Sequence, residues 1–301
     1  VLSTGASGFL GAWLAAALIE RGEKVHALDQ RDDRKLLRDL VGVEMAADVA
    51  WTTGDIRDSS LVEKVVAESG VRAIAHLAAI TIPPCRDNPG VCFEINVIGH
   101  INVLEAARRH GVKHFVYTSS TAGLPRGALH SPVNIYGVTK RATEDISKVF
   151  YLEHGITSIG LRPNVVYGYG RNAGETAAIS EAIRAAAEGR PYVMPYDGCM
   201  CFQYVEEVVD VILRCLAACP TQPVVSDITT TPETIGDVIA AIKAVEPAAR
   251  IEVSGKTRPS PDIPLDNAPL KSLIGTWRHV PLQEGVKRTF DHYRARMGAI
   301  A

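Results

Sequence analysis

The first half of the chain alternates short apolar runs with longer amphipathic stretches. The short runs are rich in β-branched and aromatic residues, which favour strands. The six strands that we predict cover residues 1–4, 24–29, 49–55, 73–78, 114–120 and 157–163. Helical periodicity follows Gly8, and the further helices that we predict cover residues 59–70, 93–111 and 136–155. This alternation predicts an α/β fold with a Rossmann-like, doubly wound parallel sheet.

The rhythm changes after residue 168, where prolines become frequent and strand–helix alternation stops. Helical patterns persist, and they cover residues 174–191, 204–219, 232–247 and 281–297. We therefore predict two domains. Residues 1–168 form a dinucleotide-binding domain, to which 204–219 returns, and residues 169–301 form a smaller, discontinuous substrate domain.

Composition and charge fit an ordinary soluble globular protein. The chain has 301 residues, 47% of them hydrophobic and 22% charged, with a formal net charge of −2. This balance gives no field that would attract nucleic acid or an anionic membrane surface. No apolar run approaches the ~18–20 residues that cross a bilayer. The chain begins without methionine, and we expect a few residues to precede Val1.

The six cysteines are too few for a disulfide scaffold, and none forms a CxxC pair. Cys199 and Cys201 lie close in sequence but lack the further Cys or His ligands of a metal motif, so we predict no metal site. This pattern favours a reducing, cytoplasmic compartment.

Three glycines, Gly5, Gly8 and Gly11, have a GxxGxxG spacing between the first strand and the first helix. Unpaired N–H groups and the positive end of the helix dipole favour an anion there. The first glycine permits a tight turn, the second lets a pyrophosphate approach the backbone, and the third allows helix to pack on sheet. The loop therefore predicts a dinucleotide site.

Two carboxylates follow the next strands. Asp29 ends the second strand, where it would bind the adenosine ribose hydroxyls and repel a 2′-phosphate, so NAD is favoured over NADP. Arg31 and Arg34 leave NADP open, because an arginine is what a 2′-phosphate needs. Asp55 is predicted to bind the adenine edge or, alternatively, to cap the helix that begins near Ser59.

Eight segments in chain order resemble the extended short-chain dehydrogenase/reductase family, also called the NAD-dependent epimerase/dehydratase family. They are TGASGFLG, Asp29, GDIRD, HLAA, NVIGHINVLEAAR, VYTSS, YGVTK and LRPNVVYG. The resemblance spans essentially the whole chain. It implies that NAD is the cofactor, and the cofactor-binding residues that we predict are Gly5, Ser7, Gly8, Phe9, Leu10, Gly11, Asp29, Asp55, Ile56, Leu77, Ala78, Ala79, Asn96, Thr118, Tyr136, Lys140, Pro163, Val165 and Val166.

The resemblance also implies that Ser120, Tyr136 and Lys140 are catalytic. A hydride leaves a secondary alcohol only if the hydroxyl proton is removed, and a free tyrosine, with a pKa of about 10, is a poor base near neutral pH. We expect Lys140 and the nicotinamide cation to lower the Tyr136 pKa, and Ser120 to hold the reacting oxygen. Thr118 or Ser119 would replace Ser120 if the strand register differs by one residue.

Asn96 resembles the position that supports the active-site lysine or the cofactor; the alternative is a core-facing polar residue. Where nucleotide-sugar members of the family carry two diphosphate ligands, this chain has Val165 and Met200. A buried dianion without donors is costly, so UDP-sugars are disfavoured as substrates. Arg171 and Arg258 are candidate anion ligands or, alternatively, solvated surface residues.

These observations predict an NAD-dependent oxidoreductase that acts on a secondary alcohol or ketone of a small polyhydroxylated or acidic substrate. The alternative is a sugar or nucleotide-sugar epimerase that uses the same Ser120, Tyr136 and Lys140 with retained NAD. A non-catalytic dinucleotide sensor would lack the Tyr–Lys pair. The resemblance implies a homodimer built on helices 93–110 and 136–153.

Overall fold

Seven parallel strands form the central sheet in the computed structural model, which describes residues 1–298. In spatial order they are β3 (Ala50–Thr53), β2 (His26–Asp29), β1 (Leu2–Thr4), β4 (Ala73–His76), β5 (His114–Thr118), β6 (Ile159–Arg162) and β11 (Val224–Asp227). The order reverses between β1 and β4, as in a doubly wound sheet. The α/β fold class and all six predicted strands are confirmed.

The expected strand count was wrong by one, because β11 pairs with the edge strand β6 (Val224 opposite Ile159). Its sequence is only VVSD, and it lies far from the other sheet strands in the chain, between α10 (Val205–Ala217) and the tail. A four-residue run without alternation is too weak a local signal to identify a strand.

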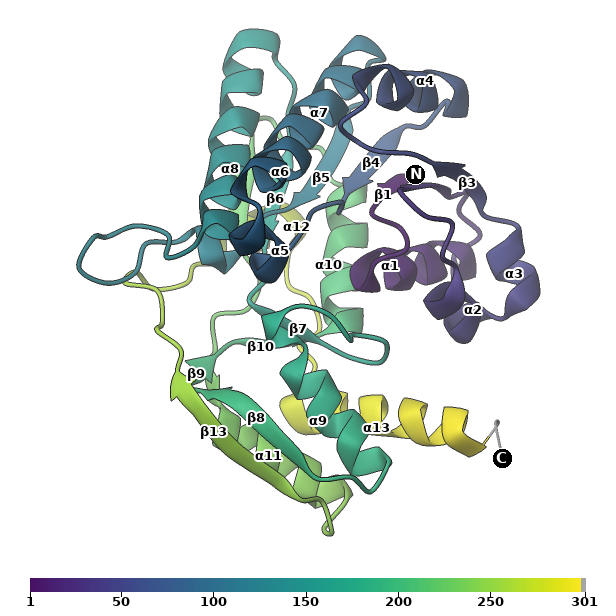
Figure 1. Ribbon diagram of the computed structural model, residues 1–301. Coiled ribbons are helices and arrows are strands. Elements are labelled where there is room, and N and C mark those ends of the chain that lie inside the picture. The colour runs from purple at the N-terminus through teal and green to yellow at the C-terminus, as the bar shows by residue number, and fades with distance from the viewer. Residues whose placement is uncertain (299–301) are drawn as a thin grey trace.

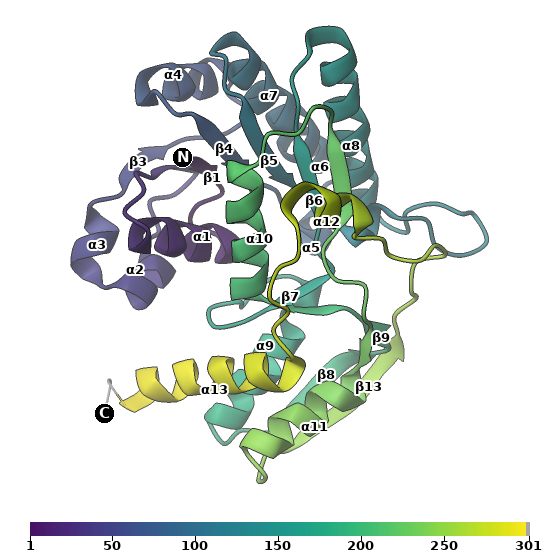
Figure 2. The same ribbon diagram turned by 180° about the vertical axis from the view of Figure 1, so that it is seen from behind.

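Helices cover both faces of this sheet (Figures 1 and 2). One face carries α4, α7 and α8, and the other carries α1 and α10. The helices of this lobe are α1 (Phe9–Glu20), α2 (Lys35–Val41), α3 (Val43–Ala47), α4 (Ser59–Ser69), α5 (Ile82–Asp87), α6 (Pro89–Phe93), α7 (Gly99–Arg109), α8 (Ile135–His154), α10 and α12 (Ala268–Ile274). A π-helical turn, η1 (Glu94–Ile98), joins α6 to α7, and a 3₁₀ turn, η2 (Thr121–Gly123), follows β5. Each face buries its own apolar cluster, represented by Leu104 and Phe115 on one side and Leu14 and Ile212 on the other.

A smaller lobe lies at the carboxyl edge of the sheet (Figure 1). Its strands are β7 (Val165–Tyr167), β8 (Tyr192–Asp197), β9 (Cys199–Met200), β10 (Phe202–Tyr204), β12 (Glu233–Thr234) and β13 (Ile251–Thr257). They form three two-stranded sheets, β7–β10, β9–β12 and β8–β13. Its helices are η3 (Glu175–Ala177), α9 (Ala178–Ala187), α11 (Ile235–Val245) and α13 (Leu282–Gly298). Two strands alone are unstable in water, and the packing of α9 against β8 and of α13 against α9 and α11 supplies the missing apolar contacts.

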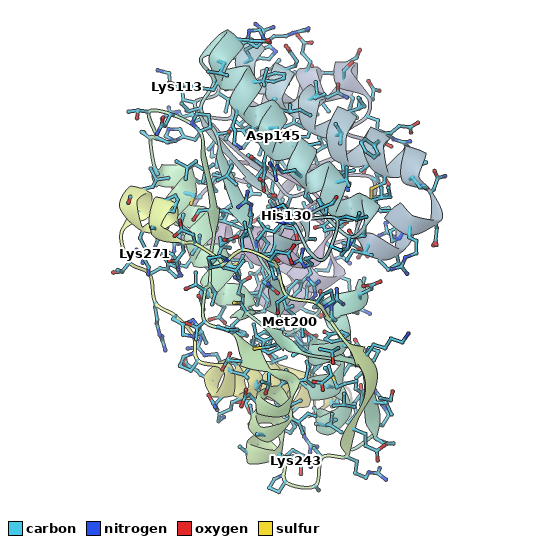
Figure 3. All side chains as sticks on the ribbon, turned by 90° about the vertical axis from the view of Figure 1, so that its left-hand side faces the viewer. Lys113, His130, Asp145, Met200, Lys243 and Lys271 are labelled. Atoms are coloured by element: carbon cyan, nitrogen blue, oxygen red, sulfur yellow. A yellow bond between two sulfur atoms is a disulfide. The ribbon has the colours of Figure 1, made fainter. Side chains whose placement is uncertain are left out.

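Met200 lies at the junction of the two lobes (Figure 3). The chain crosses this junction repeatedly, since β6 and β11 belong to the large sheet while β7 and β12 do not. The two lobes therefore share a boundary built from many segments. None of the helices within residues 1–298 combines the length and the apolar character needed to cross a membrane.

Candidate active site

The glycine loop lies between β1 and α1, and backbone contacts leave no room for side chains there. Gly5 has a φ of 73°, and a Cβ on it would lie 2.7 Å from the backbone nitrogen of Ala78. A Cβ on Gly11 would lie 2.2 Å from the carbonyl oxygen of Gly5. Gly8 is the N-cap of α1 and offers no side-chain acceptor, so the first amides of the helix remain available to an anion. The loop thus has the shape that a pyrophosphate requires.

Asp29 lies beside this loop at the end of β2. Its Oδ2 accepts a hydrogen bond from the Ser7 amide at 3.0 Å, and its Oδ1 accepts one from the Arg31 amide at 3.4 Å. The side chain of Arg34 is engaged elsewhere, with Asp32 and with three backbone carbonyls, and its guanidinium lies over the Trp51 ring. Arg31 is exposed and lines the cavity described next. Of the two arginines, only Arg31 therefore remains placed for a 2′-phosphate.

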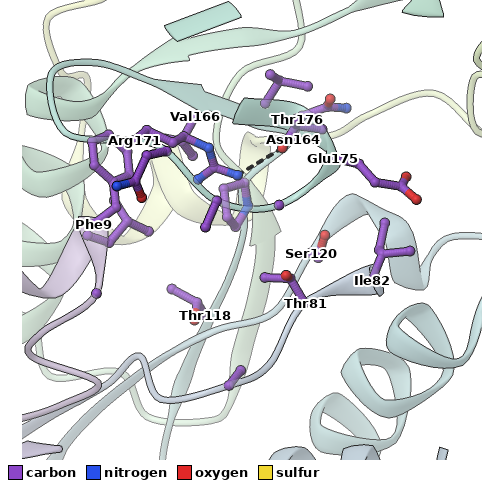
Figure 4. A pocket seen from close by; sticks show the side chains of 18 of the residues that line it. Phe9, Thr81, Ile82, Thr118, Ser120, Asn164, Val166, Arg171, Glu175 and Thr176 are labelled. Carbon is purple, nitrogen blue, oxygen red and sulfur yellow. Dashed lines mark hydrogen bonds between the residues drawn. The ribbon is translucent and has the colours of Figure 1, made fainter. Parts of the chain in front are cut away.

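A cavity of about 1340 Å³ extends from the glycine loop to the smaller lobe. It is larger than the ~300–1,000 Å³ of an ordinary small-molecule pocket, which leaves space for a dinucleotide and a second molecule. The predicted residues that line it are Gly5, Ser7, Gly8, Phe9, Leu10, Gly11, Leu77, Ala79, Thr118, Ser120, Tyr136, Lys140, Pro163, Val165 and Val166. Figure 4 shows part of this cavity, with Phe9 on one side and Thr118 and Ser120 on another.

Five predicted cofactor residues do not line the cavity: Asp29, Asp55, Ile56, Ala78 and Asn96. Asp29 and Ala78 border it through their contacts with Ser7 and Gly5. Ile56 is buried against Gly99 of α7, where a Cβ on the glycine would meet its Cδ1 at 2.5 Å.

Asp55 lies by a separate, shallower hollow next to the cofactor side. Its carboxylate accepts hydrogen bonds from Gln30 at 2.9 Å and from Arg57 at 2.6 Å, and the Arg57 bond holds the pKa of Asp55 below its usual range. Asp58, not Asp55, caps α4 by accepting from the Leu61 amide, so the alternative capping role of Asp55 was wrong. An adenine edge would have to displace these side-chain partners.

Asn96 lies in the π-helical turn η1 and is buried. Its amide bonds both the N–H and the carbonyl of Ile80, and it also donates to Thr139 at 3.1 Å. Thr139 precedes Lys140 in α8. Asn96 therefore ties the segment after β4 to the helix that carries the Tyr–Lys pair, as a positioning residue rather than a direct ligand.

Tyr136 and Lys140 begin α8 and leave it on the same face, toward the cavity. Asn134 caps the helix by accepting from the Gly137 amide at 2.8 Å. Gly137 permits close approach, since a Cβ there would lie 2.2 Å from the carbonyl oxygen of Ala122. The Lys140 Nζ donates to the Thr118 carbonyl at 2.7 Å and lies 5.6 Å from the Tyr136 ring centroid. The structure thus places the two side chains where β5 ends.

Burial dominates the electrostatics of Tyr136 in the protein without cofactor. Burial raises the pKa of Tyr136 above that of a free tyrosine, while a hydrogen bond with Ser120 and the charge of Arg171 act in the opposite direction. Lys140 is itself buried, which lowers its pKa to about 8. In the protein without cofactor, desolvation of the phenol therefore outweighs the nearby charges. The expectation that Lys140 and the nicotinamide cation together lower the Tyr136 pKa stays a prediction for the complex.

The register question at the end of β5 is decided by Glu144. Ser119 and Ser120 both line the cavity, but the Ser119 hydroxyl is engaged because it donates to the buried Glu144 at 2.5 Å. Ser120 accepts from the Ala122 amide at 3.1 Å, and its hydroxyl proton remains available in the cavity that Tyr136 also lines. Glu144 is buried and also binds Arg162 through two bonds of 2.6 and 2.5 Å. Glu144 was not predicted as a site residue, although it lies four residues after Lys140 and therefore on the same face of the helix.

The segment after β4 also lines the cavity, which was not predicted from the sequence. Thr81, Ile82 and Pro84 line the cavity from the start of α5, a helix too short and proline-rich to give a periodic signal. Asn164 lines it from the end of β6. Val165 and Met200, which replace the two diphosphate ligands of the resembled enzymes, both line it as buried apolar side chains.

The cysteines differ from expectation in one respect. Cys85 and Cys92 form a disulfide, whose two sulfurs lie against the Asn96 amide. Disulfides are rare in reducing compartments, so this bond runs against the reducing, cytoplasmic compartment inferred from the cysteine pattern. Cys199 is exposed and Cys201 is buried. Among residues 1–298, no three His, Cys, Asp or Glu side chains are grouped in a way that could hold a metal ion.

Known proteins with similar sequences were compared with this chain. The family model described as "NAD dependent epimerase/dehydratase family" matches residues 1–226. UDP-glucuronate 4-epimerase 2 of Arabidopsis thaliana is 31% identical over 182 residues, which are 56% of this chain and 42% of that protein. The chain thus spans less than half the length of this curated relative.

Solved structures resemble the chain over almost its whole length. The UDP-glucose 4-epimerase of Thermus thermophilus, in complex with NAD, superposes with a TM-score of 0.77 at 25% identity, covering 97% of this chain and 98% of that one. The L-threonine dehydrogenase of Clostridium difficile superposes with a TM-score of 0.85 at 20% identity, covering 98% and 97%, which shows a shared fold. By the family match, the glycine loop and the Tyr–Lys helix together, the chain belongs to the NAD-dependent epimerase/dehydratase family of extended short-chain dehydrogenases/reductases.

Proposed function

We propose that this protein is an NAD-dependent dehydrogenase that interconverts a secondary alcohol and a ketone on a small polyhydroxylated or acidic substrate. One observation carries the proposal: Tyr136, Ser120 and Lys140 line the same cavity as the glycine loop. A base, a hydroxyl and a dinucleotide loop that share one cavity can act on one substrate carbon.

The residues present fit NAD. The backbone crowding at Gly5 and Gly11 is the cradle of a pyrophosphate, and Asp29 lies where the second strand ends. When bound, NAD supplies the acceptor or donor of the hydride. In this proposal the cofactor domain is the lobe of the seven-stranded sheet, which is residues 1–164 with α10, β11 and α12. The other segments of residues 165–298 supply the substrate side.

The protein's own groups handle the proton. Tyr136 takes the alcohol proton in the oxidation direction and returns it in the reduction direction. Ser120 holds the reacting oxygen beside the phenol. Lys140 acts through its charge, since its Nζ is fixed on the Thr118 carbonyl near the Tyr136 ring. Val165 and Met200 keep the substrate side apolar where a diphosphate would need donors.

The rival function is a sugar or nucleotide-sugar epimerase, and it is favoured by the names of the relatives, several of which are UDP-sugar epimerases. One experiment separates the two. The purified protein is incubated with NAD and a panel of sugars, aldonates, hydroxy acids, L-threonine and UDP-sugars, and NADH absorbance and product configuration are followed. We expect NADH to accumulate with a hydroxy acid or sugar. Inversion of a UDP-sugar without net NADH would establish the epimerase instead.

Cofactor choice gives a second prediction. Asp29→Asn keeps an acceptor for the Ser7 amide but removes the negative charge, so we expect NAD affinity to fall about tenfold and NADP affinity to rise. Calorimetric titration of both cofactors measures this. The matched control is Asp33→Asn, an exposed carboxylate that also lines the cavity. If Asp29→Asn leaves the NAD-to-NADP preference unchanged, Asp29 does not choose the cofactor.

We also propose a homodimer. The outer faces of η1 and α8 expose apolar side chains, among them Ile98 at 48% and Leu152 at 78%. Exposed apolar groups on adjacent helices favour association with a second helix pair. Light scattering of the purified protein is expected to give the mass of two chains, and a monomer mass at micromolar concentration would refute the dimer.

A further inference from the structure

Arg171 extends from the turn after β7 into the cavity. Gly170, with a φ of 88°, precedes it in this turn. The Arg171 Nη2 donates to the Thr176 hydroxyl at 2.8 Å, and the Arg171 guanidinium carbon lies 5.6 Å from the centroid of the Phe9 ring. Figure 4 shows the guanidinium between Phe9 and Thr176, with Ser120 across the cavity. The alternative of a solvated surface arginine was therefore wrong.

Arg171 carries a positive charge without a counter-ion. Within residues 1–298, no carboxylate lies within 4.0 Å of its guanidinium, and its buried Nε has no hydrogen-bond acceptor. Burial lowers the pKa of Arg171, which is the mark of a cation that its surroundings stabilise poorly. An unpaired, largely buried charge is costly unless a ligand supplies its partner.

The other arginines near the substrate side of the cavity are already satisfied. Arg258 pairs with Glu175 at 3.4 Å. Arg126 has no carboxylate partner within 4.0 Å among the described residues, but its Nε and Nη1 donate to the carbonyls of Pro259 and Leu124, whereas the Nε of Arg171 has no acceptor. Glu175 in turn binds Arg86 at 2.7 Å. Glu175, the nearby carboxylate that lines the cavity, is therefore engaged with Arg86 and Arg258 and does not pair with Arg171.

The guanidinium of Arg171 lies over Phe9 of the glycine loop, and it also lies close to the substrate side of the cavity. Its charge acts on Tyr136 and on Tyr196 of β8, which belongs to the smaller lobe. The pyrophosphate has its own site at the amides that begin α1. An anion on Arg171 would thus lie between the reacting phenol and the substrate lobe.

We propose that Arg171 anchors a carboxylate of the substrate, which makes the substrate a small hydroxy acid or its keto acid. The inference rests on the proposed dehydrogenase function and narrows its substrate class. The guanidinium plane suits two carboxylate oxygens, and the bond to Thr176 fixes its orientation. The carboxylate would be oriented from Arg171 while the secondary alcohol reaches Ser120 and Tyr136.

The test measures anion binding without turnover. Malonate is the probe, and malonamide is its neutral counterpart of similar size. Each is titrated into the protein saturated with NADH, and binding is followed by calorimetry. We expect the wild-type protein to bind malonate but not malonamide, and Arg171→Gln to weaken malonate binding about 10- to 100-fold. Arg171→Lys keeps the charge but loses the planar fork, so it is expected to recover only part of the loss.

Two controls keep the result decisive. Arg86 pairs with Glu175 but does not line the cavity. Arg86→Gln therefore removes a positive charge outside the cavity, and malonate affinity should be unchanged. Circular dichroism checks that each variant is folded, and NADH affinity is measured separately. If Arg171→Gln does not fold, the Arg171→Lys result decides.

Three outcomes would overturn the inference. Wild-type protein that binds malonate no better than malonamide has no carboxylate site. Equal malonate affinity in wild type and Arg171 variants removes Arg171 from the site. A loss of NADH affinity without a loss of malonate affinity assigns Arg171 to the cofactor. Because none of these depends on turnover, they are separable from failure of the dehydrogenase assay, which would instead refute the proposed function.

Discussion

Replacing Tyr136 with phenylalanine is expected to lower kcat by about 10²- to 10⁴-fold while NAD still binds, because a positioned acid–base group contributes a factor of that size. The substitution removes only the hydroxyl and leaves the ring that lies near Lys140. Turnover is measured with the substrate found in the NAD panel, and NAD affinity by calorimetry.

The same variant tests how the phenol is activated. Without cofactor, burial raises the pKa of Tyr136, so almost no phenolate is present near neutral pH. Bound NAD would add the positive charge of its nicotinamide ring to the cavity that Tyr136 lines, and this charge would favour the phenolate. Oxidation, which needs the deprotonated phenol, should therefore accelerate as pH rises through the pKa of the complex. Reduction, which needs the protonated phenol, should slow over the same range.

The matched control is Tyr151→Phe, the same change on α8 at a residue outside the cavity. It should keep full turnover and the wild-type pH profile. Retention of wild-type kcat by Tyr136→Phe would remove this tyrosine from the chemistry, whatever the cofactor does.

Removal of the buried Glu144 carboxylate is expected to destabilise the protein by about 3 kcal/mol, because the largely buried Arg162, 19% exposed, would lose its carboxylate partner. Glu144 is 1% exposed and accepts from both Arg162 and Ser119. Chemical denaturation of Glu144→Ala measures the loss in the free energy of unfolding.

Asp145 provides the control on the same helix. It pairs with Arg141 at 3.3 Å and with Lys148 at 3.1 Å, but all three side chains are at least half exposed, so Asp145→Ala should cost less than about 1 kcal/mol. The double variant Glu144→Ala/Arg162→Met should recover much of the lost stability, since it removes the orphaned cation as well. Equal losses for Glu144→Ala and Asp145→Ala would show that the buried pair contributes nothing special.

Glu144 also acts on the site. Its charge raises the pKa of Lys140 against the effect of burial, and it engages the Ser119 hydroxyl, which leaves the Ser120 hydroxyl available in the cavity. In the folded fraction of a Glu144→Gln variant, the pKa of Lys140 should therefore be lower than in the wild-type protein. A smaller fraction of Lys140 would then be charged, and the Tyr136 phenolate would be less favoured. Glu144 therefore contributes both to the contact between α8 and β6 and to the charge of the catalytic Lys140.

The amino-acid sequence by itself determined the features that depend on neighbouring residues. Strand and helix periods are local, so the six strands and the helix that carries Tyr136 and Lys140 were predictable. The glycine spacing was equally local, because the tight turn and the helix start it requires lie within a few residues.

Only the tertiary structure decided the features that depend on distant segments. Residues 224–227 form the strand β11 because they pair with the edge of β6, which is distant in sequence. The disulfide of Cys85 and Cys92 forms because α5 and α6 bring the two sulfurs together. Sequence cannot show that a charge lacks a partner, since that is a property of every segment around it. For this reason the isolation of Arg171, the pairing of Glu144 with Arg162 and the burial that raises the pKa of Tyr136 became visible only in three dimensions.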